Sequence, residues 1–352
     1  MTTLAELTTF RVGGPVDELV EVESEADLIA AVREADEAGI PLLVVGGGSN
    51  LLAHDEGFRG RVVRDLRTGF SVQDDGFCGG VSLTAPAGAE WDSVVETAVT
   101  EGWVGLEALS GIPGSAGAAP VQNIGAYGAE LSETLATVRV WDRAESRVRT
   151  MFAVELGFGY RQSVLKSSLV AGEHGASPRW IVLDVTMQMR FGTISGEVQY
   201  EQLAQALGIR VGEKAPTADV RAAVLSLRAS KGMVLDAADH DTWSAGSFFT
   251  NPVVPDAQVP DGAPRFPASG GVKTSAAWLI EHAGFAKGFA LPGSHAALSG
   301  KHTLALTNRG GATGAEVLEL ARHVRDGVRE AFGITLEPEP MLLDERGGLV
   351  TL

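Results

Sequence analysis

The sequence LLVVGGGSNLL, residues 42–52, places a short apolar run directly before three consecutive glycines. Residues 42–45 predict a buried strand, because a short, fully apolar run bounded by turn residues is typical of one. Glycine lets the backbone approach a bound group closely and adopt dihedral angles that other residues avoid. Successive N–H groups in such a turn can hold an anion without any lysine. We therefore expect a strand that leads into a ligand-binding loop.

The segment before this strand completes a β-α-β unit. Residues 16–22 (VDELVEV) alternate apolar and polar residues, as a half-buried strand does. Ser24 is a suitable N-cap for a helix with a regular apolar face, and Gly39 is a suitable end for it.

The rest of the chain mixes strand and helix patterns, and those expected at 275–282 and 303–307 suggest a smaller α+β unit. We expect strands over 81–85, 138–141, 180–187, 303–307 and 334–343. We expect helices over 94–99 (ended by Gly102), 221–231, 275–282 and 313–333, the last begun by a Thr313–Glu316 capping box. Residues 251–267 contain five prolines and are predicted to be a loop.

Composition excludes several classes of protein. The chain has 352 residues, of which 45% are hydrophobic, enough for a folded protein of two or three domains. A net charge of −17 argues against nucleic-acid binding, which needs a basic surface. Cys78 is the only cysteine, so the chain has no internal disulfide, and the seven histidines form no HxH or HxxxH pair that would suggest a metal site. We see no signal peptide and no membrane-spanning run, and expect a cytoplasmic protein.

A second glycine-rich segment, GIPGSAGAAPVQNIGAYG at 111–128, resembles the first in its density of small residues. A flexible loop is one interpretation of it. Apolar residues are interleaved through it, however, and favour an ordered, cofactor-binding loop. Residues 46–51 are not a dinucleotide fingerprint, because Leu51 stands where its third glycine would be. No stretch matches a P-loop, because Gly293 is too far from Gly300 and Lys301, and His302 replaces the serine or threonine.

Seven segments in order resemble the UDP-N-acetylenolpyruvoylglucosamine reductases, flavoenzymes of bacterial cell-wall precursor synthesis. They are TFRVGG (9–14), GGGSNLL (46–52), the whole of 111–128, FGYR (158–161), AGSFFTNP (245–252), AAWLI (276–280) and LEPE (336–339). Tyr200 further resembles the tyrosine in the insertion of the longer subtype of this family.

The resemblance implies three α+β domains, two of which form a FAD-binding scaffold of the vanillyl-alcohol-oxidase type. The first FAD-binding subdomain is expected at 1–67. The second is expected at 68–232, completed by the C-terminal segment 334–352. The substrate-binding domain is expected at 233–333.

The resemblance also implies a reaction with two halves. NADPH reduces non-covalently bound FAD, and the enolpyruvyl ether of UDP-N-acetylglucosamine then receives a hydride at its β-carbon and a proton at its α-carbon. The product, UDP-N-acetylmuramate, serves peptidoglycan synthesis, and through it cell-wall biogenesis, cell shape and cell division. The partner is thus a small molecule, and we expect a monomer.

Three residues match the catalytic positions of the family. Arg161 would stabilise the charge that develops on the substrate carboxylate, since its planar guanidinium never loses its proton. Glu339 would share this role, in its protonated form or through a hydrogen bond. Ser247 would donate the proton to the α-carbon. Pro340 follows Glu339 where the family has valine, which restricts Glu339 to extended dihedral angles and leaves Glu337 as the second choice.

The remaining site residues are also carried over from the resemblance. The cofactor-binding positions are Gly46, Gly47, Gly48, Ser49, Asn50, Leu51, Gly111, Gly114, Ser115, Gly117, Ala118, Gln122, Asn123, Ile124, Gly125, Ala126, Tyr127 and Gly128. The substrate-binding positions are Tyr160, Arg161, Tyr200, Lys231, Asn251 and Lys273. No metal is expected.

Two other functions are compatible with the same motifs. One is an oxidase of the vanillyl-alcohol-oxidase type, which would often attach its flavin through histidine or cysteine. Residues 46–52 contain neither, and His54 is the only candidate nearby. The other is a binding protein that has lost catalysis.

Overall fold

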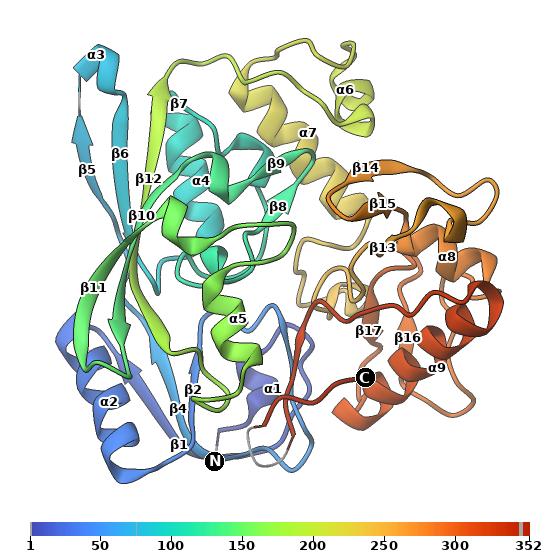
Figure 1. Cartoon of the computed structure of the whole chain (residues 1–352), viewed down its shortest axis with the longest axis horizontal. Coiled ribbons are helices and arrows are strands. Elements are labelled where there is room, and N and C mark those ends of the chain that lie inside the picture. Colours follow the sequence, from blue (N-terminus) through green and yellow to red (C-terminus); the bar gives the residue numbers. More distant parts are fainter. Residues whose placement is uncertain (1, 75, 345–347) are drawn as a thin grey trace.

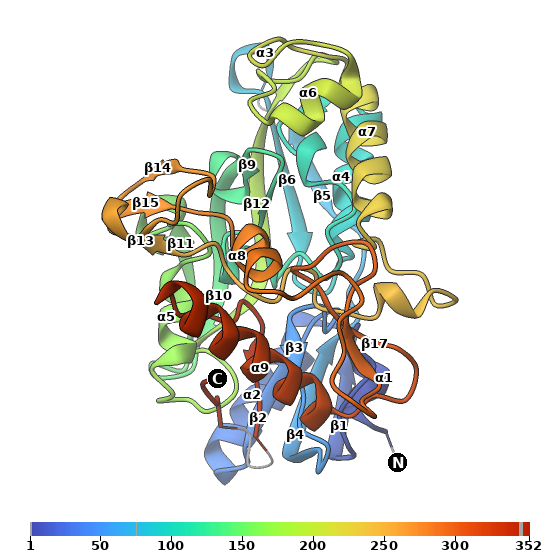
Figure 2. The same cartoon turned by 90° about the vertical axis from the view of Figure 1, so that its right-hand side faces the viewer.

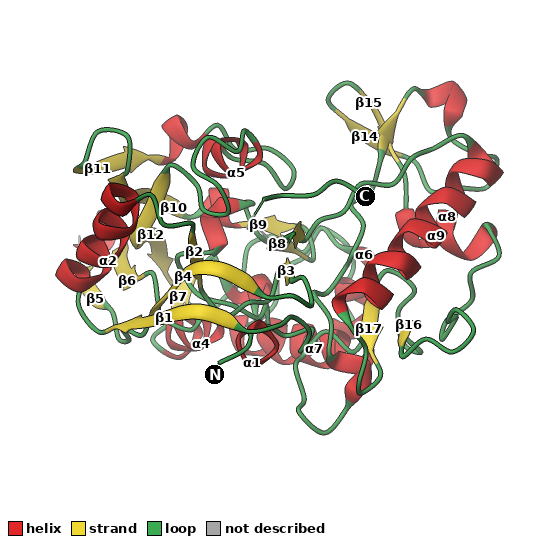
Figure 3. Cartoon of the chain, turned by 90° about the horizontal axis from the view of Figure 1, so that it is seen from below, coloured by secondary structure: helices red, strands yellow, loops and turns green. Residues whose placement is uncertain are grey.

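The computed structural model describes residues 2–74, 76–344 and 348–352. The chain mixes helices with a largely antiparallel set of strands, which confirms the α+β class (Figure 1). Seen from below, the strands β10 (Leu135–Asp142), β11 (Arg147–Phe152) and β12 (Trp180–Phe191) lie toward one end of the molecule, and the helices α8 (Ala276–His282) and α9 (Gly314–Phe332) lie toward the other (Figure 3). None of the described helices is long and apolar enough to cross a bilayer.

A small parallel sheet near the N-terminus has the strand order β1-β4-β2. Its elements are α1 (Leu4–Leu7), β1 (Val16–Val22), α2 (Glu25–Ala38), β2 (Leu42–Val45) and β4 (Phe58–Asp65). The expected β-α-β unit is confirmed: Ser24 caps α2 and Gly39 ends it at φ 64°. Strand β4, which we did not predict, lies between the two strands that we did predict.

A larger antiparallel sheet follows, with the order β11-β10-β12-β6-β5, and β7 pairs with the end of β12. Its strands are β5 (Ser71–Asp74), β6 (Val81–Pro86), β7 (Trp103–Val104), β10 (Leu135–Asp142), β11 (Arg147–Phe152) and β12 (Trp180–Phe191). The helices in this part of the chain are α3 (Gly76–Gly79), α4 (Trp91–Thr100), α5 (Val164–Val170), α6 (Glu201–Leu207) and α7 (Thr217–Ser230). Helices α4 and α7 lie side by side along this sheet (Figure 2).

The C-terminal part contains short strands and two packed helices. They are β13 (Val253–Val254), β14 (Phe266–Ala268), β15 (Gly271–Lys273), α8 (Ala276–His282), β16 (Ala296–Leu298), β17 (Leu306–Asn308) and α9 (Gly314–Phe332). The predicted capping box of α9 is confirmed, and Gly333 ends this helix. Strand β18 (Met341–Leu342) returns to pair in parallel with β3 (Leu51–Leu52), so the chain end lies against the first glycine loop.

Short elements complete the loops between these units. The hairpin of β8 (Gly125–Ala126) and β9 (Ala129–Glu130) lies in the second glycine segment. The 3-10 turns are η1 (Glu107–Leu109), η2 (Ala119–Val121), η3 (Leu131–Glu133), η4 (Ala153–Leu156), η5 (His240–Thr242) and η6 (Asp256–Gln258).

Three sequence-based expectations were wrong in extent. The strand expected at 303–307 is β17 at Leu306–Asn308, because the Ala305 N–H closes a turn on the carbonyl of His302. The strand expected at 334–343 is regular only in β18, since Pro338 and Pro340 have no N–H to donate to a ladder. The proline-rich loop contains β13 and the start of β14.

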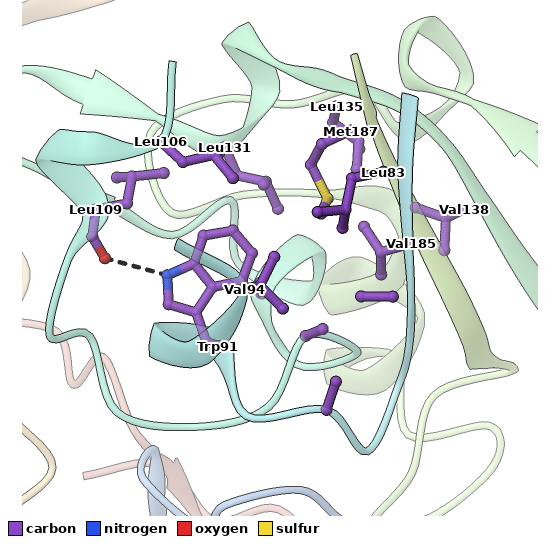
Figure 4. Close-up of a cluster of buried hydrophobic side chains, with 14 of the residues drawn as sticks. Leu83, Trp91, Val94, Leu106, Leu109, Leu131, Leu135, Val138, Val185 and Met187 are labelled. Atoms are coloured by element: carbon purple, nitrogen blue, oxygen red, sulfur yellow. Dashed lines mark hydrogen bonds between the residues drawn. The ribbon is translucent and has the colours of Figure 1, made fainter. Parts of the chain in front are cut away.

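The core between α4 and the large sheet contains a fully buried tryptophan (Figure 4). Trp91 packs with side chains from both layers, among them Leu83, Val94 and Val185. Its indole N–H donates to the carbonyl of Leu109 at 3.1 Å. The hydrogen bond matters because a buried polar group without a partner is costly.

We expect Trp91→Phe to lower the free energy of unfolding by about 1–3 kcal/mol, because it removes packing volume and leaves the Leu109 carbonyl without its donor. Denaturant unfolding of the purified protein measures this change.

Trp243→Phe is the matched control. The indole nitrogen of Trp243 is buried and has no hydrogen-bond partner among the described residues. Trp243→Phe should lower the free energy of unfolding clearly less than Trp91→Phe does. Equal losses of unfolding free energy in the two variants would contradict the role of the Trp91 hydrogen bond.

Candidate functional site

A cavity of about 1300 Å³ lies where the two glycine segments meet the C-terminal part of the chain. Its walls come from residues 43–51, 112–127, 242–254 and 333–342, with further residues from α5 and α7. Segments that are far apart in sequence therefore share one site.

Glycines bring the first two walls into backbone contact. A Cβ atom at Gly47 would lie 2.8 Å from the Cα of Gly114, and one at Gly46 would lie 2.2 Å from the Oγ of Ser115. Gly114 itself has a φ of +125°, which is accessible mainly to glycine. Only glycine at these positions permits the close approach of the two loops.

The first loop presents unused backbone donors beside the cavity. The N–H groups of residues 47–50 donate no hydrogen bond to any described residue. The loop is held by its side chains instead: Ser49 Oγ donates to the carbonyl of Pro113 at 2.8 Å, and Asn50 Nδ2 donates to Gln122 Oε1 at 2.9 Å. Free N–H groups at the end of a buried strand are suited to holding an anionic group such as a diphosphate.

Arg161 sits in a strained backbone conformation beside the second glycine segment. Its φ is +56°, and Asn123 and Tyr127 nearby are also in the left-handed region. Such conformations concentrate at functional sites, where the surroundings hold them in place. The guanidinium donates to the carbonyl of Gly125 at 2.7 Å, which fixes its direction.

The Arg161 guanidinium meets the carboxyl group of Glu339 in the cavity wall. Arg161 Nε lies 2.9 Å from Glu339 Oε1 in an ion pair, although it is not aligned for a hydrogen bond with Glu339 or any other described residue. Gln122 Nε2 donates to the same oxygen at 3.3 Å. Burial raises the pKa of Glu339, while the positive charges of Arg161 and Lys166 oppose that rise.

The backbone holds Glu339 in place despite the two neighbouring prolines. Its N–H donates to the carbonyl of Phe248 at 2.8 Å, and its own carbonyl accepts from Asn50 Nδ2 at 3.3 Å. Glu337 also lines the cavity.

Ser247 lines the cavity and directly follows Gly246 in a loop. Its hydroxyl makes no hydrogen bond with the described residues. The adjacent Phe248 and Phe249 are fully buried and anchor this loop in the C-terminal core.

Two clusters of tyrosine and lysine side chains flank the cavity. Tyr127 and Tyr200 meet edge to face with their centroids 5.5 Å apart, and Lys231 lies 5.5 Å from the centroid of Tyr127. Lys273 Nζ lies 4.5 Å from the centroid of the Tyr160 ring. These contacts gather most of the expected substrate-binding residues near the cavity.

Four of the predicted site residues lie outside the cavity wall, namely Gly111, Asn123, Gly128 and Lys273. Asn123 is fully buried, donates to Glu130 and Gly159, and accepts from the Ser132 N–H. It therefore supports the second glycine loop from behind. Asn251 lines the cavity and accepts from the Ala276 N–H at 2.9 Å, at the start of α8.

Sequence reasoning missed three cations in the cavity wall, Lys166, Arg228 and Arg325. Arg325 pairs with Asp326, whereas Lys166 and Arg228 form no ion pair with a carboxylate in the described part of the chain. Arg228 shares the buried face of α7 with Val220 and Val224, and a charge on that apolar stripe was a usable signal. Burial lowers the pKa of Arg228 and of Lys166, so both favour a negatively charged ligand.

No group of histidine, cysteine, aspartate or glutamate residues suited to a metal ion occurs among the described residues. Cys78 belongs to α3, and its side chain lies outside the described part.

Comparisons with known proteins agree with this geometry. Residues 16–151 match the family model described as FAD binding domain, and residues 237–343 match the C-terminal domain of UDP-N-acetylenolpyruvoylglucosamine reductase. The reductase of that name from Cutibacterium acnes is 52% identical over 97% of this chain and 89% of its own length. This chain belongs to the UDP-N-acetylenolpyruvoylglucosamine reductase family. The reductase from Nocardia farcinica is 53% identical over the same shares of both chains.

The fold of the reductase family is also found in this chain. The crystal structure of the reductase from Thermus caldophilus matches it with a TM-score of 0.65 at 27% identity, covering 97% of each chain. The chain is thus an FAD-dependent oxidoreductase.

The residues on the cavity wall fit FAD. The N–H groups of residues 47–50, which donate to no described residue, suit its diphosphate. The glycines where residues 46–47 contact residues 114–115 carry no side chains, so the backbone there can approach the cofactor closely.

We expect Gly47→Ala to weaken FAD binding by about tenfold or more, because the new methyl group must push the two loops apart. Flavin fluorescence during titration of the apoprotein with FAD measures the dissociation constant.

Gly196→Ala controls for the general effect of an added methyl group. No described atom beyond its chain neighbours lies within 4 Å of a Cβ at Gly196, and this variant should bind FAD as the parent does. Equal affinity of Gly47→Ala and the parent would refute the role of the loop contact.

Proposed function

We propose that this chain is an NADPH-dependent reductase that converts the enolpyruvyl ether of UDP-N-acetylglucosamine into UDP-N-acetylmuramate. The observation that carries the proposal is the convergence of Arg161, Glu339 and the free Ser247 hydroxyl on one cavity. Bound non-covalently, FAD supplies the redox chemistry: it accepts hydride equivalents from NADPH and passes them to the β-carbon of the substrate.

Arg161 would bind the substrate carboxylate. Its Nε is buried 2.9 Å from Glu339 Oε1 but makes no well-aligned hydrogen bond with the described residues, so a substrate carboxylate would have to share the guanidinium with Glu339. The planar guanidinium also stabilises the enediolate charge that develops when hydride reaches the β-carbon.

Glu339 would act in its protonated form. Burial already raises the pKa of Glu339. A substrate carboxylate that pairs with Arg161 neutralises the positive charge nearest to Glu339 and brings a negative charge close to it. Both effects raise the pKa of Glu339 further. A protonated carboxyl group can then donate a hydrogen bond to the enediolate.

Ser247 would donate the proton to the α-carbon. A serine hydroxyl is a weak acid, but the carbanion it faces is strongly basic, so proton transfer is favourable. The absence of a competing hydrogen bond leaves this hydroxyl free within the described site.

The far ends of the substrate would meet the flanking groups. Lys231 donates to Gln202 Oε1 at 2.6 Å, and burial together with the nearby Arg228 lowers its pKa. A diphosphate would relieve that unfavourable environment, with Tyr200 beside it. Tyr160, Asn251 and Lys273 would position the sugar and the carboxylate.

The same proposal places the enzyme in peptidoglycan precursor synthesis, as a cytoplasmic monomer. Residues 1–67 and 68–232 with 334–352 would form the FAD-binding domains, and 233–333 the substrate-binding domain.

An anaerobic visible spectrum tests the function. We expect a flavin spectrum that bleaches with NADPH and recovers only when the enolpyruvyl substrate is added. Flavin that NADPH cannot bleach would favour an oxidase, and a protein that takes up no FAD would favour a binding role. Either result would refute the proposal.

We expect Ser247→Ala to be reduced by NADPH at the parent rate but to recover its flavin spectrum about 10²- to 10⁴-fold more slowly, the usual loss when general-acid catalysis is removed. Stopped-flow absorbance separates the two half-reactions.

Ser226→Ala makes the same chemical change on the exposed face of α7 and should leave both half-reactions unaltered. If Ser247→Ala slows both halves equally, the proton-donor role is wrong.

A further inference from the structure

Lys166 lies in the first turn of α5, which the structure ties directly to the site. Ser163 caps this helix by accepting from the Lys166 N–H at 3.1 Å. The same serine hydroxyl donates to the carbonyl of Val121 in the second glycine segment. The cap therefore fixes the start of α5, and with it the base of the Lys166 side chain, against the cavity wall.

The Lys166 ammonium reaches the backbone of Arg161. Lys166 Nζ donates to the carbonyl of Arg161 at 3.3 Å and lines the cavity. Arg161 has a φ of +56°, a conformation that a side-chain-bearing residue keeps only when its surroundings hold it. The hydrogen bond from Lys166 to the Arg161 carbonyl is one such restraint.

Lys166 also belongs to the charges around Glu339. Each segment packed against Glu339 contributes a defined group. Residues 160–161 contribute the Tyr160 phenol and the Arg161 guanidinium, and α5 contributes Lys166. The glycine loops contribute neutral amides, and the charge of Glu337, in the same segment as Glu339, acts to raise the pKa of Lys166.

Lys166 has no ion pair of its own in the described part of the chain. Burying an ammonium group that forms no ion pair lowers the stability of the folded protein, unless nearby polar or negatively charged groups interact with it. Its positive charge lowers the pKa of Glu339, against the effect of burial.

We propose that Lys166 is a positioning residue for the Arg161–Glu339 pair: its ammonium anchors the Arg161 carbonyl and places a second positive charge beside the Glu339 carboxyl group. This inference rests on the proposed function, in which that pair stabilises the substrate enediolate. The loss of Lys166 should therefore affect the substrate half-reaction and its pH dependence, and leave flavin reduction by NADPH intact.

The test is the rate of flavin recovery by substrate, measured by stopped flow across pH in the parent, Lys166→Met and Lys166→Arg. Protonated Glu339 is the active form, so the rate falls as pH rises through its midpoint. Removing a nearby positive charge raises that midpoint, by about one pH unit in Lys166→Met. Loosening of Arg161 should also slow recovery roughly tenfold to a hundredfold at low pH.

Lys166→Arg keeps the charge and the donors, and should return the midpoint toward that of the parent. Glu339→Gln identifies the titrating group, because its profile should lack the transition. The pH titration of the oxidised flavin spectrum, without substrate, gives a second readout that should shift in the same direction.

Lys214→Met, on an exposed lysine, controls for loss of one charge from the chain. An unchanged midpoint in Lys166→Met, whether or not recovery is slower, would overturn the positioning role. A parent enzyme whose reduced flavin is never reoxidised by the substrate would instead overturn the proposed function, so the two failures are distinguishable.

Discussion

The site depends on the contact between Arg161 and Glu339 in the cavity wall. Little water reaches either side chain, because only 18% of the Arg161 side-chain surface and 13% of that of Glu339 are exposed. Removing two charges from water is costly, and their attraction repays that cost only in good geometry. Here the guanidinium also donates to the Gly125 carbonyl, and the carboxyl group accepts from Gln122. The structure thus holds the two side chains together, although the contact between Arg161 Nε and Glu339 is not a well-aligned hydrogen bond.

Most of the surrounding architecture serves to bring those two residues into one wall. Glycines at 46, 47 and 114 allow the two loops to touch through their backbones, so the Asn50 side chain can reach both Gln122 and the Glu339 carbonyl. Strand β18 then pairs with β3, which brings the chain end back to the first loop. The same loop keeps the N–H groups of residues 47–50 without a hydrogen-bond acceptor among the described residues, an arrangement suited to an anionic group.

The sequence predicted the elements with strong local signals and missed those set by distant contacts. The β-α-β unit and α9 have caps and clear periodicity, and both were confirmed. Strand β4 was missed because arginines interrupt its apolar pattern, and it becomes a central strand only through its two neighbours. Family motifs identified Arg161 and Glu339, whereas Lys166 and the supporting role of Asn123 depend on contacts that no local pattern encodes.

A double-mutant cycle on the rate of flavin recovery by substrate tests the central claim most directly, with Arg161→Gln, Glu339→Gln and the double variant. If the two side chains act as one unit, the double variant should be little slower than the slower single variant, because the first change already destroys the pair. Losses that multiply across the two substitutions would show that Arg161 and Glu339 act independently, and would contradict the account.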